Sequence, residues 1–258
     1  HKAILEPLEH LEKLGFEITL LPPNKGGWVE PEKLQNALRP NTLLVSVMHV
    51  NNETGVIQPI EEMADVLSEH DTFFHTDSAQ GFGKDIKPLQ HPLIDLISIS
   101  GHKIYGPKGV GALVTRRRRF ERPPLNPLMF GGGQEKGLRP GTLPVHLIAG
   151  LGKAAYLAQN ENEENLKKCL EFKTKILKAF EHLNPVIHGD PNRTVSHTLN
   201  ISFSELNSEA VIISLKHLAA ISNGSACTST SYEPSHVLKA MGLSNEEAET
   251  ALRWSWCQ

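Results

Sequence analysis

The chain has 258 residues, of which 39% are hydrophobic and 21% charged, and its formal net charge is -3. These values are typical of a globular protein with a sizeable core, and they argue against direct nucleic-acid binding. No apolar run reaches the roughly 18 residues of a membrane span, so no membrane association is expected. The three cysteines have unrelated spacings, which indicates a reducing, cytoplasmic setting rather than a disulfide framework or a metal site.

Helical and strand-like segments alternate through the first half of the chain. Apolar residues recur at helical spacing over residues 4–14, and residues 16–20 alternate as a strand does. Further helices are expected at residues 30–38 and 59–69, and apolar strands at residues 43–48, 72–76, 93–99 and 110–114. This order predicts an α/β domain with a layered sheet, in which ligands bind at the carboxyl ends of the strands.

The second half has a different character. A loop rich in glycine and proline leads into helices expected at residues 143–158 and 165–183. Half-buried strands at residues 186–188 and 199–203 precede a helix at 208–217, for which Ser208 is the expected cap. We therefore expect a large domain at residues 1–160 and a smaller α+β domain at residues 161–258.

Polar residues gather where the predicted strands end. They are Asn51, Asn52, Asp77, Gln80, Ser100, His102 and Lys103. Singly, an aspartate after a strand is most often a cap and a lysine there is most often solvated. Together they match the needs of pyridoxal 5'-phosphate (PLP), which requires an amine for a Schiff base, a carboxylate for its pyridine nitrogen, and donors for its phenolic oxygen and phosphate.

Several motifs resemble those of the cysteine desulfurases of the NifS/IscS type, which are fold-type I PLP enzymes of the class-V aminotransferase kind. The motifs are HVNNETG at residues 49–55, DSAQ at 77–80, SGHKIYGPKG at 100–109, GGGQE at 131–135, LRPGT at 138–142 and SACTS at 225–229. Their order and spacing agree over nearly the whole chain. The resemblance implies a three-layer fold with a mostly parallel sheet and a smaller α+β C-terminal domain.

The resemblance implies a role for each cofactor-binding residue. Lys103 would carry PLP as a Schiff base, and Asp77 would pair with the pyridine nitrogen. The other contacts would come from Asn52 and Gln80 to the phenolic oxygen, from Ser100 and His102 to the phosphate, and from His1 stacked on the ring. Thr142 would reach the phosphate in a neighbouring subunit, which implies a homodimer. Thr142 also fits a helix N-cap before Pro144.

Cys227 points to sulfur chemistry. It lies in a small, polar stretch at residues 222–231, which is unsuited to packing in a core. The resemblance implies that Cys227 takes sulfur from L-cysteine as a persulfide and leaves L-alanine. Lys103 and His1 would move protons in this reaction. Asn52 and Arg253 would bind the substrate.

Other interpretations stay open. The acceptor could belong to iron–sulfur cluster assembly, tRNA thiolation or DNA phosphorothioation. A selenocysteine lyase shares most of these motifs. An inactive protein that binds scaffold or sulfur-carrier proteins would share them as well. The family has a region before the position of His1 and continues past that of Gln258. We therefore expect this chain to be a fragment that lacks the N-terminal part of the fold.

Three features receive no catalytic role. The four consecutive arginines at residues 116–119 are interpreted as a solvated strand edge, with a docking patch for an acidic acceptor or a DNA-modifying assembly as the alternative. Cys169 is expected to be an ordinary helix residue, and Cys257 is assigned no function.

Overall fold

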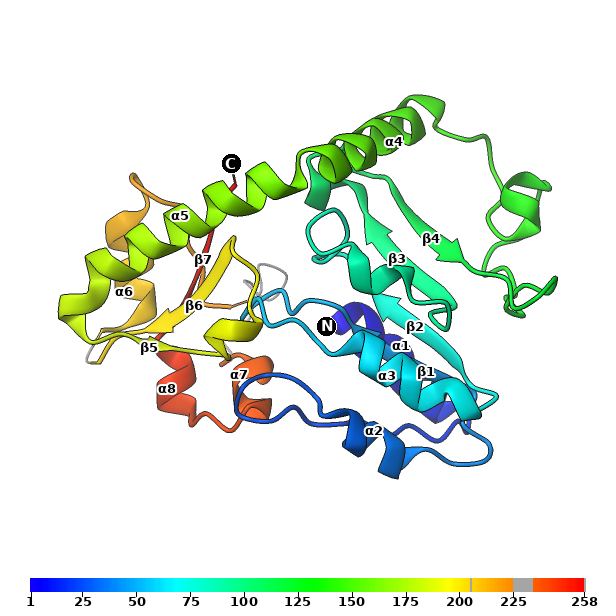
Figure 1. Ribbon diagram of the computed structural model, residues 1–258, viewed down its shortest axis with the longest axis horizontal. Helices are drawn as coiled ribbons and strands as arrows, with labels where there is room; N and C mark the ends of the chain where they lie inside the picture. The colour runs from blue at the N-terminus through cyan, green and yellow to red at the C-terminus, as the bar shows by residue number, and fades with distance from the viewer. Residues whose placement is uncertain (205, 225–233, 258) are drawn as a thin grey trace.

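Two separate sheets organise the protein. A computed structural model describes residues 1–204, 206–224 and 234–257 (Figure 1). The larger sheet contains β1 (Leu44–Met48), β2 (Phe73–Asp77), β3 (Leu96–Ser100) and β4 (Gly111–Thr115), in that spatial order. The smaller sheet contains β5 (Val186–Ile187), β6 (Thr198–Ser202) and β7 (Ala251–Ser255).

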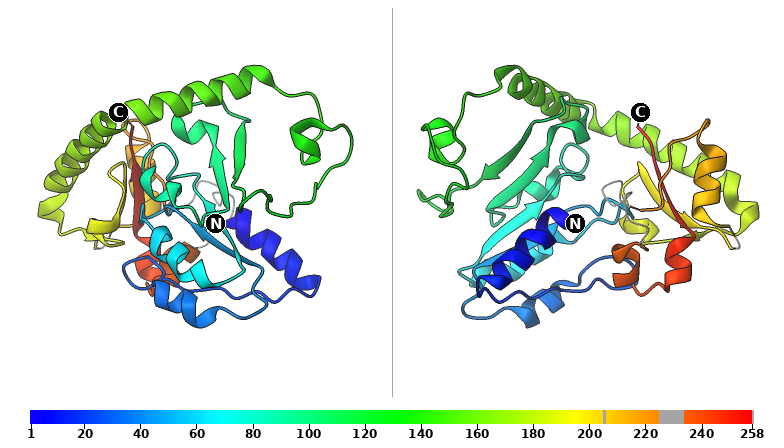
Figure 2. Two further views of the ribbon diagram at one scale, coloured as in Figure 1. Left: turned by 45° about the vertical axis from the view of Figure 1, so that its right-hand side comes forward. Right: turned by 180° about the vertical axis from the view of Figure 1, so that it is seen from behind.

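The larger sheet is mostly parallel, as predicted. β1 pairs with β2 and β2 with β3 in parallel, while β4 runs antiparallel to β3. Helix α1 (Lys2–Lys13) lies on one face of this sheet, and α3 (Ile60–Val66) lies on the other beside α2 (Pro31–Ala37) (Figures 1 and 2). The resulting three layers confirm the predicted fold class.

A buried core holds α3 against the sheet. Phe74 of β2 is fully buried, and Ile60 and Met63 of α3 belong to the same cluster. Burial of each such side chain contributes on the order of 2 kcal/mol. Because the strands are fixed by this core, the positions of their carboxyl ends are fixed as well.

The smaller sheet is covered by a long helix. Helix α4 (Val145–Asn160) ends just before α5 (Asn162–Phe180), which runs along the smaller sheet (Figure 1). Phe180 of α5 packs against Phe203 and Trp254, each with ring centroids 5.3 Å away. Three short helices complete this region: α6 (Ser208–Leu215), α7 (His236–Ala240) and α8 (Asn245–Glu249). The proposed division into two domains at residue 160 stays a prediction.

The remaining helical elements are short 3-10 turns. They are η1 (Leu67–Glu69), η2 (Lys87–Gln90), η3 (Gly101–Ile104), η4 (Gln134–Gly137), η5 (Glu181–Leu183) and η6 (Pro191–Arg193). In the part of the chain that the structure describes, no helix combines the length and the apolar character needed to cross a bilayer.

Three local predictions are wrong. Residues 16–20 form no strand, because a strand needs a hydrogen-bonding neighbour and no described residue pairs with them. Asn207 caps α6 in place of Ser208, accepting from the Ala210 amide at 3.1 Å. Thr142 does not cap α4, whose N-cap is Pro144 with no side-chain hydrogen bond.

Candidate functional site

The predicted site residues of β2 and β3 lie at one edge of the larger sheet. Asp77 is the last residue of β2, and its register partner on β3 is Ser98, just before Ser100. The Asp77 carboxylate accepts a hydrogen bond from the Ala79 amide at 3.1 Å, which fixes the turn that leads to Gln80. Because β2 and β3 are parallel, the residues that follow them emerge at the same edge.

Lys103 lies in a tightly closed turn. The Gly101 amide donates to the Val110 carbonyl at 2.9 Å, and the Gly106 amide donates to the Gly101 carbonyl at the same distance. A Cβ at Gly101 would stand 2.9 Å from the Val110 oxygen, so a side chain there would clash with backbone. Tyr105 takes a left-handed conformation with φ 63°. This turn holds Lys103 half-buried directly after β3.

Two side chains suited to binding a phosphate lie just before Lys103 in the chain. The Ser100 hydroxyl and the His102 Nδ1 lie 3.0 Å apart. Together with the Asp77 carboxylate and the Lys103 amine, they form a set at one sheet edge whose chemistry fits PLP. The described residues at this sheet edge could therefore hold PLP.

The other predicted cofactor residues are placed differently. His1 is the N-cap of α1, and its Nδ1 accepts from the Ala3 amide at 3.1 Å. Its end of α1 faces the middle of the molecule (Figures 1 and 2). Thr142 is exposed in the loop before α4. Among the described residues, no hydrogen bond joins either one to the strand-end set.

The two predicted substrate-binding residues are brought together. Arg253 lies within β7, and its Nη1 donates to the Asn52 carbonyl at 3.2 Å. This bond links the smaller sheet to the turn that follows β1. Cys227 lies outside the described residues.

The sequence analysis did not predict the structural role of two buried histidines, His49 and His75. His49 is fully buried, with its Nδ1 3.1 Å from the Ser78 hydroxyl and its Nε2 2.9 Å from an Asp85 carboxylate oxygen. A Cβ on Gly81 would overlap the His49 ring, so the turn after β2 needs glycine there. The histidine and the glycine stand in the HVNNETG and DSAQG stretches, but only the structure pairs them.

His75 forms a polar row across the sheet beneath Asp77. Its ring nitrogens lie 2.8 Å from the Ser46 hydroxyl and 2.9 Å from the Ser98 hydroxyl. Burial lowers the pKa of His75, although the nearby Asp77 carboxylate opposes that shift. The alternation of polar residues in β1, β2 and β3 is the sequence feature that could have predicted this row.

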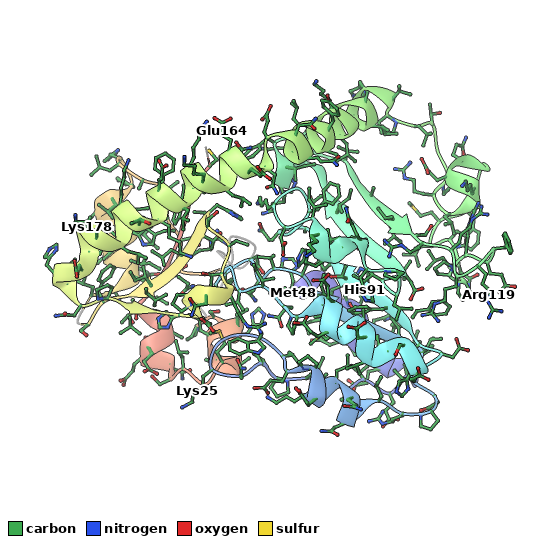
Figure 3. All side chains as sticks on the ribbon, viewed as in Figure 1. Lys25, Met48, His91, Arg119, Glu164 and Lys178 are labelled. Carbon is green, nitrogen blue, oxygen red and sulfur yellow. The ribbon has the colours of Figure 1, made fainter. Side chains whose placement is uncertain are left out.

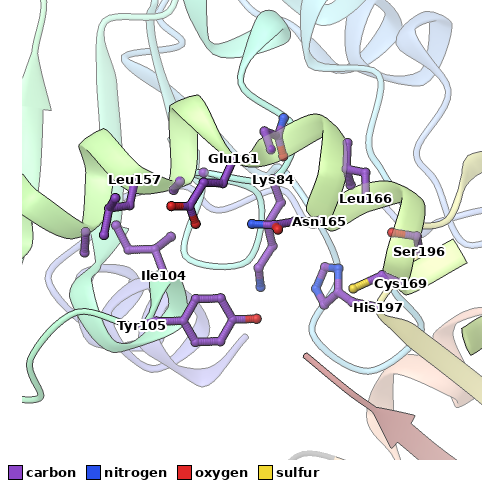
Figure 4. Close-up of a pocket in the computed structure, with 14 residues that line it drawn as sticks. Lys84, Ile104, Tyr105, Leu157, Glu161, Asn165, Leu166, Cys169, Ser196 and His197 are labelled. Atoms are coloured by element: carbon purple, nitrogen blue, oxygen red, sulfur yellow. The ribbon is translucent and has the colours of Figure 1, made fainter. Parts of the chain in front are cut away.

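A cavity of about 230 Å³ lies below the junction of α4 and α5 (Figure 4). Lys84 reaches into it, near Tyr105, Cys169 and His197. Burial, and then the charge of Lys103, lowers the pKa of Lys84 to about 8. Burial likewise lowers the pKa of His197 to about 3. Lys84 is therefore a second amine, and it lies close enough to Lys103 for their positive charges to repel each other.

The arginine run is only partly solvated. Arg118 forms two hydrogen bonds to the buried Asp95 carboxylate, at 2.7 and 2.8 Å, and Arg116 donates to the carbonyls of His91 and Leu89. The solvated interpretation is therefore wrong for these two arginines. Arg117 and Arg119 are exposed, and Arg119 lies at the outer edge of the molecule (Figure 3).

Known proteins match the chain along its whole length. A family model described as aminotransferase class-V matches residues 1–257. Cysteine desulfurase IscS of Vibrio campbellii is 46% identical over 257 residues, which make up 99% of this chain and 63% of that relative. The chain thus spans less than two thirds of the length of the curated relatives it matches.

Solved structures give the same grouping. All of this chain superposes on 72% of DndA from Streptomyces lividans, with 49% identity and a TM-score of 0.89. It also superposes on 71% of SspA, solved in complex with cysteine, with 39% identity and a TM-score of 0.81. The chain belongs to the aminotransferase class-V family, within the group that contains the NifS- and IscS-type proteins.

Proposed function

We propose that this protein is a PLP-dependent cysteine desulfurase. The observation that carries the proposal is the juxtaposition of Asp77, Ser100, His102 and Lys103 at neighbouring strand ends. The likeness to cysteine desulfurase IscS and to SspA, which was solved with cysteine, supports L-cysteine as the substrate.

Each predicted site residue would have its own role in the reaction. PLP supplies an electron sink that stabilises negative charge at the substrate Cα. The Asp77 carboxylate would keep the pyridine nitrogen protonated, and the Lys103 amine would take the Cα proton. Arg253 would bind the substrate carboxylate, with its guanidinium oriented by the bond to the Asn52 carbonyl. His1 would stack on the ring and shuttle protons, and Gln80 would contact the phenolic oxygen.

Cys227 would perform the sulfur transfer. Its thiolate attacks the substrate sulfur, so that a sulfur–sulfur bond forms while the bond from that sulfur to Cβ breaks. A proton adds to Cβ and takes up the electron pair of the broken bond. The products are L-alanine and a persulfide on Cys227. No external oxidant or reductant is needed.

We also propose a homodimer in the cytoplasm. Thr142 is exposed, as a residue that reaches the cofactor of a neighbouring subunit must be. The sulfur would pass to an acceptor protein of iron–sulfur cluster assembly, tRNA thiolation or DNA phosphorothioation. A reducing compartment suits a mechanism that depends on a free thiol.

The test uses the purified protein with PLP and L-cysteine. L-alanine should form, and mass spectrometry should find one added sulfur on Cys227. Cys227→Ala should keep the PLP absorbance and lose the persulfide, whereas Cys257→Ala should behave as wild type. Sulfide release by Cys227→Ala at the original rate would contradict the assigned role.

A further inference from the structure

The turn after β1 is rigid. The Asn51 side-chain oxygen accepts from the amides of Glu53, at 2.8 Å, and Thr54, at 3.0 Å. The Gly55 amide closes the turn on the Asn51 carbonyl at 2.9 Å, with Gly55 at φ +75°. Such a side-chain-closed turn leaves little freedom to the residues inside it. The direction of the Glu53 side chain is therefore set by the backbone.

Glu53 points into the smaller sheet region and not into solvent. It is only 2% exposed, and its backbone carbonyl accepts from the Asn200 amide group of β6 at 3.2 Å. The Ser235 hydroxyl donates to the Glu53 Oε2 at 2.5 Å. Within the described residues, no ion pair reaches this carboxylate. A buried carboxyl group that depends on hydrogen bonds holds its partners firmly in place.

The Glu53 carboxylate binds the flank that follows residues 225–233. Ser235 is the N-cap of α7, where its hydroxyl also accepts from the Leu238 amide at 3.2 Å. Gly224, on the preceding flank, lies near the same Glu53 oxygen, because a Cβ added there would stand 3.5 Å from it. The hydrogen bond from Ser235 is therefore the link between the Glu53 side chain and this part of the chain.

A second link joins the same turn to the Gly224 flank. The backbones of Ser222 and Arg253 exchange two hydrogen bonds, at 3.2 and 2.6 Å, and Arg253 in turn donates to the Asn52 carbonyl. Asn52 and Glu53 are neighbours in the turn. The turn therefore holds both flanks, the preceding one through the bond from Arg253 to Asn52 and the following one through the bond from Ser235 to Glu53.

We propose that Glu53 is a positioning residue whose carboxylate fixes Ser235, which caps α7 after residues 225–233, to the turn that carries Asn52. The importance of this anchor for sulfur transfer rests on the role proposed for Cys227. The anchor itself depends only on the hydrogen bond from Ser235 to Glu53.

Limited proteolysis tests the anchor without PLP or L-cysteine. Chymotrypsin cleaves after Tyr232, which lies between the flanks, and after Phe130, which is 88% exposed and serves as the internal reference. Glu53→Gln and Ser235→Ala should each raise cleavage after Tyr232 at least fivefold, with cleavage after Phe130 unchanged. The double variant should add nothing further, because both changes act on the same bond, which Glu53→Gln weakens and Ser235→Ala removes. Glu62→Gln, on an exposed position of α3, is the matched control.

Unchanged cleavage after Tyr232, or an equal rise at both positions, would overturn the proposal. If Glu53→Gln fails to fold, Ser235→Ala decides alone, because it removes a single hydroxyl. With PLP and L-cysteine, both variants should form the Cys227 persulfide at least fivefold more slowly. A protein that forms no L-alanine at all but shows the cleavage pattern would refute the proposed function and leave the anchor standing.

Discussion

The two sheets contribute to the site in different ways. In the larger sheet, Asp77 and Lys103 follow directly after parallel neighbours, so that short motifs are gathered at one edge by regular pairing. In the smaller sheet, Arg253 lies within an antiparallel strand and reaches Asn52, which is 201 positions earlier in the chain. The first kind of placement follows from local order, whereas the second depends on how two distant parts of the chain pack.

The largest expected effect is in the larger sheet, at Lys103. Lys103→Ala should reduce L-alanine formation from L-cysteine below detection, because the proposed reaction uses the Lys103 amine both to hold PLP and to take the Cα proton. Its folding free energy in urea should stay within about 0.5 kcal/mol of wild type, since the side chain has no described structural bond. Lys108→Ala, in the same turn but exposed, should retain full activity. Activity in Lys103→Ala would break the assignment of the site to this sheet edge.

Arg118→Ala tests the ion pair between Arg118 and Asp95, which lies at the end of the larger sheet opposite the candidate site. Asp95 is 2% exposed and would lose its bidentate partner, which leaves its buried carboxylate with the hydrogen bond from the Phe74 amide. The expected loss of folding free energy is about 3 kcal/mol in urea titration, reduced from the upper range because Arg118 itself is partly exposed. Arg117→Ala should change stability by less than about 0.5 kcal/mol. Equal effects from the two variants would contradict the distinction drawn within the arginine run.

His197, beside the smaller sheet, makes stability depend on pH. Its pKa falls from 6.5 to about 3 on folding, so the folded state binds fewer protons between those values. Stability is then complete above pH 6.5 and declines as the pH drops toward 3. In His197→Gln, the loss of folding free energy between pH 7 and pH 4.5 should be roughly 2 to 3 kcal/mol smaller than in wild type. Identical losses would show that His197 is not the group responsible.

The smallest effect concerns the cap of α6. Asn207→Ala should lower the folding free energy by about 1 kcal/mol, because the Ala210 amide loses its acceptor. Asn207→Ser should stay close to wild type, since serine also caps helices well. Thermal unfolding of the two variants provides the comparison, and equal destabilisation would argue against the cap.

The predictability of the protein follows the same division. The layered α/β domain and the grouping of Asp77, Ser100 and Lys103 could be predicted, because the alternation of helices and strands and the residues at strand ends are local features. The mostly parallel sheet was expected from the family resemblance. The anchoring role of Glu53 could not, because it depends on a hydrogen bond from Ser235, which is 182 positions away in the sequence. The failed strand at residues 16–20 has the same cause, since pairing requires a partner that the local pattern does not specify.

The most direct test of the account asks which lysine holds PLP. Lys84 is the physical competitor, because its lowered pKa of about 8 leaves more of its amine neutral and nucleophilic than in an ordinary lysine. Borohydride reduction of the PLP-loaded protein, followed by peptide mapping, locates the attached group. We expect the phosphopyridoxyl mass on the peptide that contains Lys103. The same mass on the Lys84 peptide would contradict it.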